Sequence, residues 1–284
     1  MSILADLHIH SNYSDGSDTI ENLVNNIEKA NISVFSLTDH DTIDGAIEIE
    51  KFVPSHIKYI RGVELTCKTR DIKCHILGYN YQPNDMDLHN LILKGKELRR
   101  QKLETRIKYL KDVWNIELTK EELAWLYSRP SVVKTHFANI LVKRGLADDN
   151  LSAMRKYLDG CKTGNTRFDG EEAINIILNA GGIPVWAHPL GGEGEKHLSE
   201  DEFLSRLNTM MECGIKGLEC YYSRYNNEEI SFLVDCANKY NLLISGGSDY
   251  HGSNKKNITI GKLNVDNRPV YCDKLTIISN LPLE

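Results

Sequence analysis

Histidine and carboxylate residues recur where predicted strands of this chain begin or end. His8 and His10 stand two apart in ADLHIH, and Asp249 and His251 repeat that spacing in GGSDYHG. Side chains alternate across a strand, so each pair points to one side, with its residues about 6–7 Å apart along the backbone. Such a pair can bind one cation, although ordinary strand histidines share the same spacing. Metal coordination is the chemistry that these residues indicate.

Five further candidates occupy comparable positions. His40 follows a strand in TDHDT, Glu64 ends the next one in RGVE, and His188 follows IPVWA. His75 begins the strand HILGY, and Asp15 lies in the turn-like SDGSDT. Each residue alone has an ordinary alternative, such as a turn aspartate, a solvated carboxylate or a strand histidine. Their shared location at strand ends, where barrel active sites gather, favours a multinuclear metal centre.

The types of residue limit which metal ions could bind and which class of reaction they could assist. Asp39 and Asp41 flank His40 and could orient its imidazole by hydrogen bonds, or could cap a helix. Histidine and carboxylate ligands without thiolate suit Mn, Fe or Zn, and they do not choose among the three. No serine or cysteine nucleophile motif is evident. Hydrolysis assisted by bound metal ions is therefore the favoured chemistry.

Alternating strands and helices must position these residues. Short apolar runs alternate with segments of helical spacing over residues 1–81 and 165–284, which predicts an α/β fold with mainly parallel strands. Residues 82–164 lack strand signals and include a long stretch rich in Lys, Arg, Glu and Leu. Thr119 and Glu122 form a capping-box pattern within that region. We therefore expect a barrel of residues 1–81 and 165–284, interrupted by a helical insertion at 82–164 near the active-site mouth.

Charge and composition argue against several other classes of protein. The formal charge of −6 gives no overall attraction to long duplex nucleic acid. No apolar run approaches the length of a membrane span, and the first residues lack a signal-peptide pattern. The seven cysteines are scattered and include no CxxC, which favours buried free thiols in a reducing compartment. We expect a cytoplasmic protein without a membrane partner.

The motifs DLHIHSNYSDG, LTDHDT, GVE, HILGY, AHP and GSDYHG occur in this order between residues 5 and 252. In this order they resemble the PHP (polymerase and histidinol phosphatase) family of metal-dependent phosphoesterases. The resemblance implies a distorted, TIM-like (β/α)7 barrel with a trinuclear metal centre. It covers most of the chain and constrains the helical insertion least.

The resemblance also implies which residues bind each divalent ion. The first ion would take His8, His10, Glu64 and Asp249, the second would take Glu64, His75 and His188, and the third would take Asp15, His40 and His251. A bridging hydroxide, held by Glu64, Asp249 and His188, would attack phosphorus in line with the leaving oxygen. Some members have histidine where this chain has Asp15, and an aspartate there resembles the subgroup that acts on small nucleotides.

That subgroup comprises stand-alone nucleoside 3′,5′-bisphosphate phosphatases and relatives that trim short RNA from its 5′ end. The implied substrate is a small phosphorylated metabolite or nucleotide, or a short oligonucleotide. Candidate phosphate contacts are His136, Arg224, Arg129, Lys134 and Arg167, each of which could instead be a solvated surface cation. A histidinol-phosphate phosphatase is the enzyme alternative. A non-catalytic, metal-dependent binding or regulatory module is the alternative of another class.

Tyrosine residues form a second group that could contact a nucleotide. Tyr221, Tyr222 and Tyr225 could stack on a base, but burial of at least two of them in the core is the simpler expectation.

Overall fold

A curved sheet forms the centre of the computed structural model, which describes residues 3–129, 131–164, 166–192, 195–263 and 267–281. Seven strands follow one another in space along this sheet in the order β1-β2-β3-β4-β6-β7-β8. Their bounds are Ala5–Ile9, Val34–Leu37, Lys58–Thr69, Ile72–Tyr79, Ile183–Trp186, Gly217–Tyr222 and Leu243–Gly247. The short β5 (Phe168–Asp169) pairs with β3, and β9 (Lys262–Leu263) and β10 (Arg268–Pro269) form a separate ribbon.

Strand β1 and the segment after β8 bring the two ends of the sheet together. The Asp249 amide donates to the His8 carbonyl at 2.8 Å, and the His10 amide donates to the Tyr250 carbonyl at 2.9 Å. A Cβ atom at Gly247 would lie 2.4 Å from the His8 amide nitrogen, so this close approach requires glycine. The predicted distorted barrel is confirmed, and its ends meet beside four of the candidate ligands.

Strand β4 reverses the direction of the sheet. It pairs antiparallel with both β3 and β6, whereas the other neighbours on the path from β1 to β8 are parallel. The amino end of β4 therefore lies beside the carboxyl ends of the parallel strands, which brings His75 to that edge. Glu64 does not end its strand as the sequence suggested, because β3 continues to Thr69 and forms a hairpin with β4.

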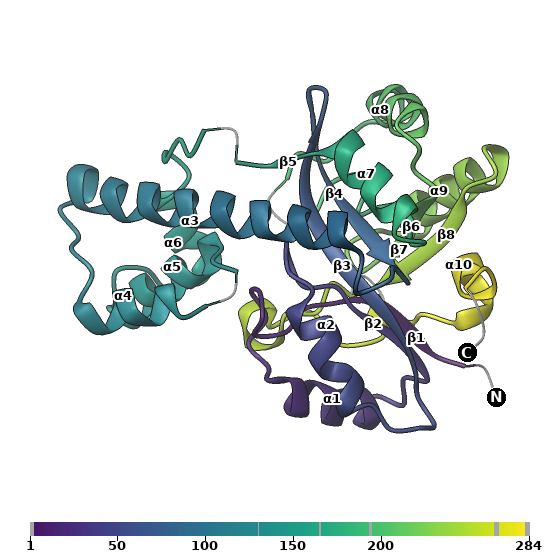
Figure 1. The fold of residues 1–284 in the computed structure, drawn as a ribbon, viewed down its shortest axis with the longest axis horizontal. Helices are drawn as coiled ribbons and strands as arrows, with labels where there is room; N and C mark the ends of the chain where they lie inside the picture. Colours follow the sequence, from purple (N-terminus) through teal and green to yellow (C-terminus); the bar gives the residue numbers. More distant parts are fainter. Residues whose placement is uncertain (1–2, 130, 165, 193–194, 264–266, 282–284) are drawn as a thin grey trace.

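Six helices lie along the barrel strands (Figure 1). They are α1 (Ile20–Lys29), α2 (Asp44–Glu48), α7 (Gly170–Asn179), α8 (Glu200–Glu212), α9 (Asn227–Lys239) and α10 (Thr276–Ser279). Helix α1 shows why such segments fold, because its apolar residues recur at helical spacing and all four are buried against β1 and β2. These four residues are Ile20, Leu23, Val24 and Ile27.

Four consecutive helices extend to one side of the barrel (Figure 1). They are α3 (Met86–Trp114), α4 (Lys120–Tyr127), α5 (Lys134–Lys143) and α6 (Asn150–Tyr157). The predicted capping box of Thr119 and Glu122 starts α4. Helix α3 contributes Leu88 and Leu91 to the barrel core, whereas its Leu103 belongs to a separate core shared with α4, α5 and α6. The division at residues 82–164 stays a prediction, because one helix belongs to both cores.

Two sequence expectations concern the chain as a whole. All seven cysteines are free thiols, and five of them are buried, as expected. Within the part of the chain that the structure describes, no helix combines the length and apolarity that crossing a bilayer requires.

Candidate metal centre

The structure brings all nine predicted ligand side chains together at one edge of the barrel. They come from β1 and the loop after it, from the ends of β2, β6 and β8, and from within β3 and β4. Polar contacts of 3.9 Å or less connect them into one network. The nine are His8, His10, Asp15, His40, Glu64, His75, His188, Asp249 and His251.

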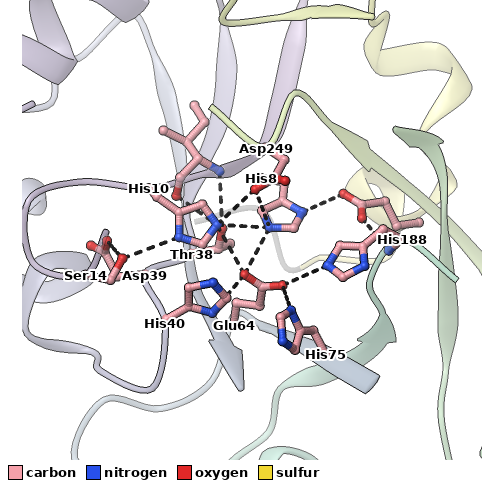
Figure 2. A network of polar contacts seen from close by, with 12 residues as sticks. His8, His10, Ser14, Thr38, Asp39, His40, Glu64, His75, His188 and Asp249 are labelled. Carbon is pink, nitrogen blue, oxygen red and sulfur yellow. Dashed lines mark hydrogen bonds and ion pairs between the residues drawn. The ribbon is translucent and has the colours of Figure 1, made fainter. Parts of the chain in front are cut away.

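Glu64 lies at the centre of this network (Figure 2). Its Oε1 atom is 2.8 Å from His75 Nδ1 and 3.2 Å from His188 Nε2. Its Oε2 atom is 3.1 Å from His40 Nδ1, 3.2 Å from His10 Nε2 and 3.3 Å from a nitrogen of His8. Five imidazole nitrogens therefore surround one carboxylate that is almost fully buried.

Asp249 lies on the opposite side of the first two histidines. Its Oδ1 atom is 3.4 Å from His10 Nε2 and 3.6 Å from His8 Nε2. Its Oδ2 atom accepts hydrogen bonds from Tyr222 at 2.9 Å and from the Lys255 ammonium at 2.7 Å. One oxygen thus faces the histidines, while the other is held by two donors that fix the orientation of the carboxylate.

Asp15 joins a third set of nitrogens. Its Oδ1 atom is 3.1 Å from His251 Nε2 and 3.6 Å from His10 Nδ1, and its Oδ2 atom is 3.9 Å from His40 Nε2. Asp15 is buried, so its carboxylate is largely removed from water. The loop after β1 therefore directs the Asp15 side chain into the candidate metal centre. An aspartate with only a turn-forming role would face solvent instead.

The donor geometry fits divalent cations. Nε2 of His8 and Nε2 of His10 lie 3.1 Å apart, although two ring nitrogens that both carry lone pairs repel each other unless a proton or cation lies between them. Nδ1 of His40 is buried and makes no hydrogen bond of acceptable geometry. Three groups of side chains each offer ligand atoms within 4.8 Å of one another. These groups are His10, Asp15, His40 and His251; His8, His10 and Asp249; and His40, Glu64 and His75.

Two of the candidate ligands adopt strained backbone conformations. His188 has φ of 30° and Asp249 has φ of 58°, both in the left-handed region that non-glycine residues rarely occupy. Each residue lies two positions beyond the end of a strand, and its side chain contacts the other candidate ligands. Strain of this kind persists where the surrounding structure enforces it, most often at functional sites.

Electrostatics keep the central carboxylate ionised. Burial alone would raise the pKa of Glu64, but the positive charge of the surrounding histidines, His8 among them, and a hydrogen bond from His10 outweigh it and hold the pKa well below its usual range. Burial lowers the pKa of His40 to about 3, so this imidazole is neutral at neutral pH and one of its two ring nitrogens has a free lone pair. An ionised carboxylate beside a neutral imidazole is the protonation state that metal coordination requires.

Glu219 supports the centre and was not predicted from the sequence. Its Oε1 atom is 2.7 Å from His8 Nδ1, and its Oε2 atom accepts the backbone amide of His188 at 2.7 Å. A carboxylate behind a ligating imidazole fixes the tautomer and the ring orientation. The available signal was one acidic residue inside the apolar strand GLECYY, and the structure shows that Glu219 is completely buried.

The two aspartates that flank His40 form hydrogen bonds with other segments and not with the His40 imidazole. Asp39 accepts hydrogen bonds from the Ser11 amide at 2.8 Å and from the Ser14 hydroxyl at 2.5 Å, so it fixes the loop after β1. Asp41 accepts the Thr66 amide at 2.7 Å and Arg99 Nε at 2.6 Å. The expectation that they orient His40 by direct hydrogen bonds is wrong, because both carboxylates turn toward neighbouring segments.

A cavity of about 340 Å³ opens above the centre, and the helical region forms part of its wall. Seven of the nine candidate ligands line it, together with Lys134 and Thr135 of α5, Arg155 of α6 and Lys255. Lys134 Nζ is 2.7 Å from Asp159, another lining residue. The wall of the cavity therefore carries three cationic side chains, and the candidate metal ligands form its floor.

Of the five predicted phosphate contacts, Lys134 lines this cavity and the other four do not. Arg129 donates to the Asn12 carbonyl at 2.7 Å and lies over the Trp125 ring. His136 is buried, and its Nδ1 accepts the Val133 amide at the start of α5. The side chain of His136 therefore caps the helix end that the sequence suggested for phosphate. The remaining two residues, Arg167 and Arg224, are half-buried and exposed, respectively.

The tyrosines pack as the simpler expectation stated. Tyr222 and Tyr225 are buried, and the Tyr225 hydroxyl accepts the Leu190 amide at 2.8 Å. Sequence reasoning missed Arg155 and Lys255 at the cavity, because neither stands in a motif and only the packing of their segments reveals them.

Two characterised relatives match nearly the whole chain. A 3′,5′-nucleoside bisphosphate phosphatase from Chromobacterium violaceum is 26% identical over 271 residues, which cover 94% of this chain and 93% of that protein. The 5′-3′ exoribonuclease Rnm of Escherichia coli is 28% identical over 257 residues, which cover 88% of this chain and 86% of that protein. Both proteins carry out phosphoester hydrolysis, as their names state.

A solved structure supports the fold. The crystal structure of a protein from Bifidobacterium adolescentis, described as a metal-dependent phosphoesterase, superposes with a TM-score of 0.79 at 24% identity. The match covers 97% of this chain and 94% of that one. The sequence model of the PHP domain matches residues 6–165, more than half of the chain and most of the strands that carry candidate ligands. The chain therefore belongs to the PHP domain family.

Proposed function

We propose that this chain is a metal-dependent phosphoric ester hydrolase that acts on a small nucleotide, such as a nucleoside 3′,5′-bisphosphate, or on a short oligonucleotide. One observation carries the proposal: five imidazole nitrogens lie 2.8–3.3 Å from the buried Glu64 carboxylate at the end of a cavity lined by cations. The nucleotide substrate is supported by the names of the two relatives and by Asp15.

The nine side chains would hold three divalent ions, with Mn, Fe or Zn suited to these ligands. When bound, such ions supply positive charge for the phosphoryl oxygens and lower the pKa of a water molecule. Glu64 would join two ion sites, because imidazoles surround both of its carboxylate oxygens. Glu219 orients His8, and Tyr222 and Lys255 orient Asp249.

Side chains at the cavity wall would bind the anionic substrate. Lys134, Arg155 and Lys255 would lie beside the phosphoryl oxygens, since all three line the cavity above the centre. The Lys255 ammonium contacts the Asp249 carboxylate, so it would also attract a phosphate bound close to that carboxylate. We retain Arg129, His136, Arg167 and Arg224 as candidate phosphate contacts outside this cavity. We also infer a cytoplasmic location.

A substrate panel tests the function. Phosphate or nucleotide release is measured with Mn from adenosine 3′,5′-bisphosphate, histidinol phosphate and a short 5′-phosphorylated RNA. We expect turnover of the bisphosphate or the RNA. Turnover of histidinol phosphate alone would favour the enzyme alternative, and no turnover by protein whose metal content is verified would favour a binding module.

A matched pair of variants tests the centre itself. Glu64→Gln keeps the size of the side chain and removes its charge, so we expect it to lose both activity and bound metal. Glu21→Gln makes the same change on the exposed first turn of α1, where no effect is expected. Elemental analysis of both proteins gives the metal content, and retained turnover by Glu64→Gln would refute the bridging role.

A further inference from the structure

The loop after β6 folds back on itself and brings Glu195 to the candidate metal centre. The Gly191 amide donates to the His188 carbonyl at 2.8 Å, and the Glu195 amide donates to the Gly192 carbonyl at 3.2 Å. A Cβ atom at Gly192 would lie 2.9 Å from His188 Nδ1, so the loop passes directly beside this imidazole. Nε2 of His188 faces Glu64, and its Nδ1 faces Glu195.

Glu195 lines two cavities. The first is the cavity of about 340 Å³ above the candidate metal centre, and the second has a volume of about 390 Å³. Two candidate ligands, His75 and His188, also line both cavities. The Glu195 side chain is 40% exposed, so a molecule bound beside these two histidines can contact its carboxylate.

The Glu195 carboxylate can accept further hydrogen bonds. Its Oε2 atom accepts the Gly192 amide at 3.0 Å and lies 3.7 Å from His188 Nδ1, which is too long for a hydrogen bond. No donor among the residues that the structure describes contacts its Oε1 atom. Glu219, in contrast, is completely buried and contacts His8 at 2.7 Å. Glu195 therefore does not support a candidate ligand in the way that Glu219 does.

Five described residues that line the cavity above the centre have carboxylates, and Glu195 differs from the other four. Asp159 forms an ion pair with Lys134 at 2.7 Å. The other three are the candidate ligands Asp15, Glu64 and Asp249. Glu195 forms no ion pair with a described lysine or arginine. An ionised carboxylate repels phosphate and only accepts hydrogen bonds, so the part of a substrate beside Glu195 must be an uncharged or cationic donor.

We propose that Glu195 is a specificity residue that accepts a hydrogen bond from the 2′-hydroxyl of a ribose. The 3′-oxygen of the same ribose carries the phosphoryl group that is bound at the candidate metal centre. The inference rests on the proposed function, because it narrows the nucleotide to a ribonucleotide. In a nucleoside 3′,5′-bisphosphate and in RNA alike, the 2′-hydroxyl is on the carbon next to the one that bears the 3′-oxygen. It is therefore the donor nearest to that phosphorus, whereas the amino groups of a base lie farther away. The same hydroxyl distinguishes RNA from DNA.

Substrates that differ only in the 2′-hydroxyl test the proposal. Turnover with Mn is measured for adenosine 3′,5′-bisphosphate and its 2′-deoxy analogue, and for a short 5′-phosphorylated RNA and the DNA of the same sequence. We expect the kcat/KM of the wild type to favour the ribose substrates roughly ten- to hundredfold, the effect of one hydrogen bond to a charged group. Glu195→Ala should lower this preference to about one. The same preference in Glu195→Ala as in the wild type would overturn the proposal.

Two controls separate recognition of the hydroxyl from a structural role. Glu200→Ala makes the same change on the exposed first turn of α8, outside both cavities, and should keep the preference of the wild type. The dissociation constant of Mn should be the same in Glu195→Ala and in the wild type. Weaker Mn binding, with an equal loss of turnover on ribose and deoxyribose substrates, would mean that Glu195 orients His188, which contradicts the proposal.

Binding without turnover separates this inference from the proposed function. Non-hydrolysable 3′-phosphonate analogues of adenosine and of 2′-deoxyadenosine are titrated by calorimetry into the Mn-loaded wild type and into Mn-loaded Glu195→Ala. We expect the wild type to bind the ribose analogue more tightly and the variant to bind both analogues equally. A wild type without this preference, or a variant that keeps it, would refute the role of Glu195. If the wild type turns over none of the nucleotides, the proposed function fails, and the calorimetric comparison still decides whether Glu195 recognises the hydroxyl.

Discussion

Replacing Glu219 by glutamine tests whether the residue behind His8 controls the metal centre. The change removes one negative charge and keeps the side-chain shape. Glutamine retains a carbonyl oxygen that can accept the His188 amide, so the backbone after β6 keeps its hydrogen bond. The contact that changes is the one at 2.7 Å between Oε1 and His8 Nδ1. The variant therefore separates the orientation of His8 from the folding of the barrel.

The contact suggests the size of the effect. Removing a carboxylate that orients a ligating imidazole typically lowers metal affinity 10- to 100-fold. Such a loss corresponds to about 1.4–2.8 kcal/mol of binding free energy. Glu219 is completely buried and His8 is equally buried, so water does not replace the lost interaction. We expect the upper half of that range.

Metal affinity is the direct measurement. Competition with a fluorescent chelator gives the dissociation constant for Mn, and the Mn concentration at half-maximal activity gives a second value. Both values should rise together in Glu219→Gln, and activity should recover at saturating Mn. Glu172→Gln is the control, because Glu172 is an exposed carboxylate whose partner is Lys94. Unchanged Mn affinity in Glu219→Gln would refute the role assigned to Glu219.

Four further results are expected. A chelator should lower the Tm by several degrees, because three carboxylates and six imidazoles would then face one another without cations; calorimetry measures this, and an unchanged Tm would contradict it. Asp41→Asn should reduce the free energy of unfolding in urea by about 3–5 kcal/mol, since it leaves the Arg99 charge buried without a partner, and a loss below about 1 kcal/mol would count against that pair. Gly247→Ala should lower both the Tm and the Mn affinity, because its Cβ would meet the His8 amide, and normal values for both would contradict the close contact. Burial lowers the pKa of Lys102 from 10.5 to about 7 in the folded state, so the free energy of unfolding that depends on Lys102 should increase as the pH rises from 7 to about 10. Urea unfolding of the wild type and of Lys102→Met at several pH values measures this, as the difference between their free energies of unfolding. A difference that does not change with pH would refute the prediction.

The sequence predicted that these side chains would lie together, because their positions follow a topological rule. Residues at the carboxyl ends of parallel strands meet at one edge of a barrel, so His40, His188 and Asp249 could be grouped without knowledge of the structure. The direction of β4 could not be predicted, because an apolar strand has the same pattern in either direction. The sequence nevertheless placed His75 in the group, and the structure brings it beside the others from the amino-terminal half of β4.

The supporting residues were harder to predict. Glu219 contacts residues that are 211 and 31 positions away in the chain, so no local spacing connects it to the centre. The cations were also difficult, because a segment can approach the cavity while its side chains point elsewhere. His136 turns back to cap α5, whereas Lys134, two residues before it, lines the cavity. Side-chain direction at a helix start depends on packing that the sequence pattern does not contain.

Helix α3 determines how the molecule can be divided. Its first turns complete the barrel core through Leu88 and Leu91, and its last turns complete the core of the four-helix region through Leu103 and Leu110. Cutting the chain within this helix would leave an uncovered apolar face on each half. The two regions should therefore unfold in a single cooperative transition. We therefore expect that the helical region cannot be removed as a separate module, because a barrel without it would expose the apolar face that the start of α3 covers.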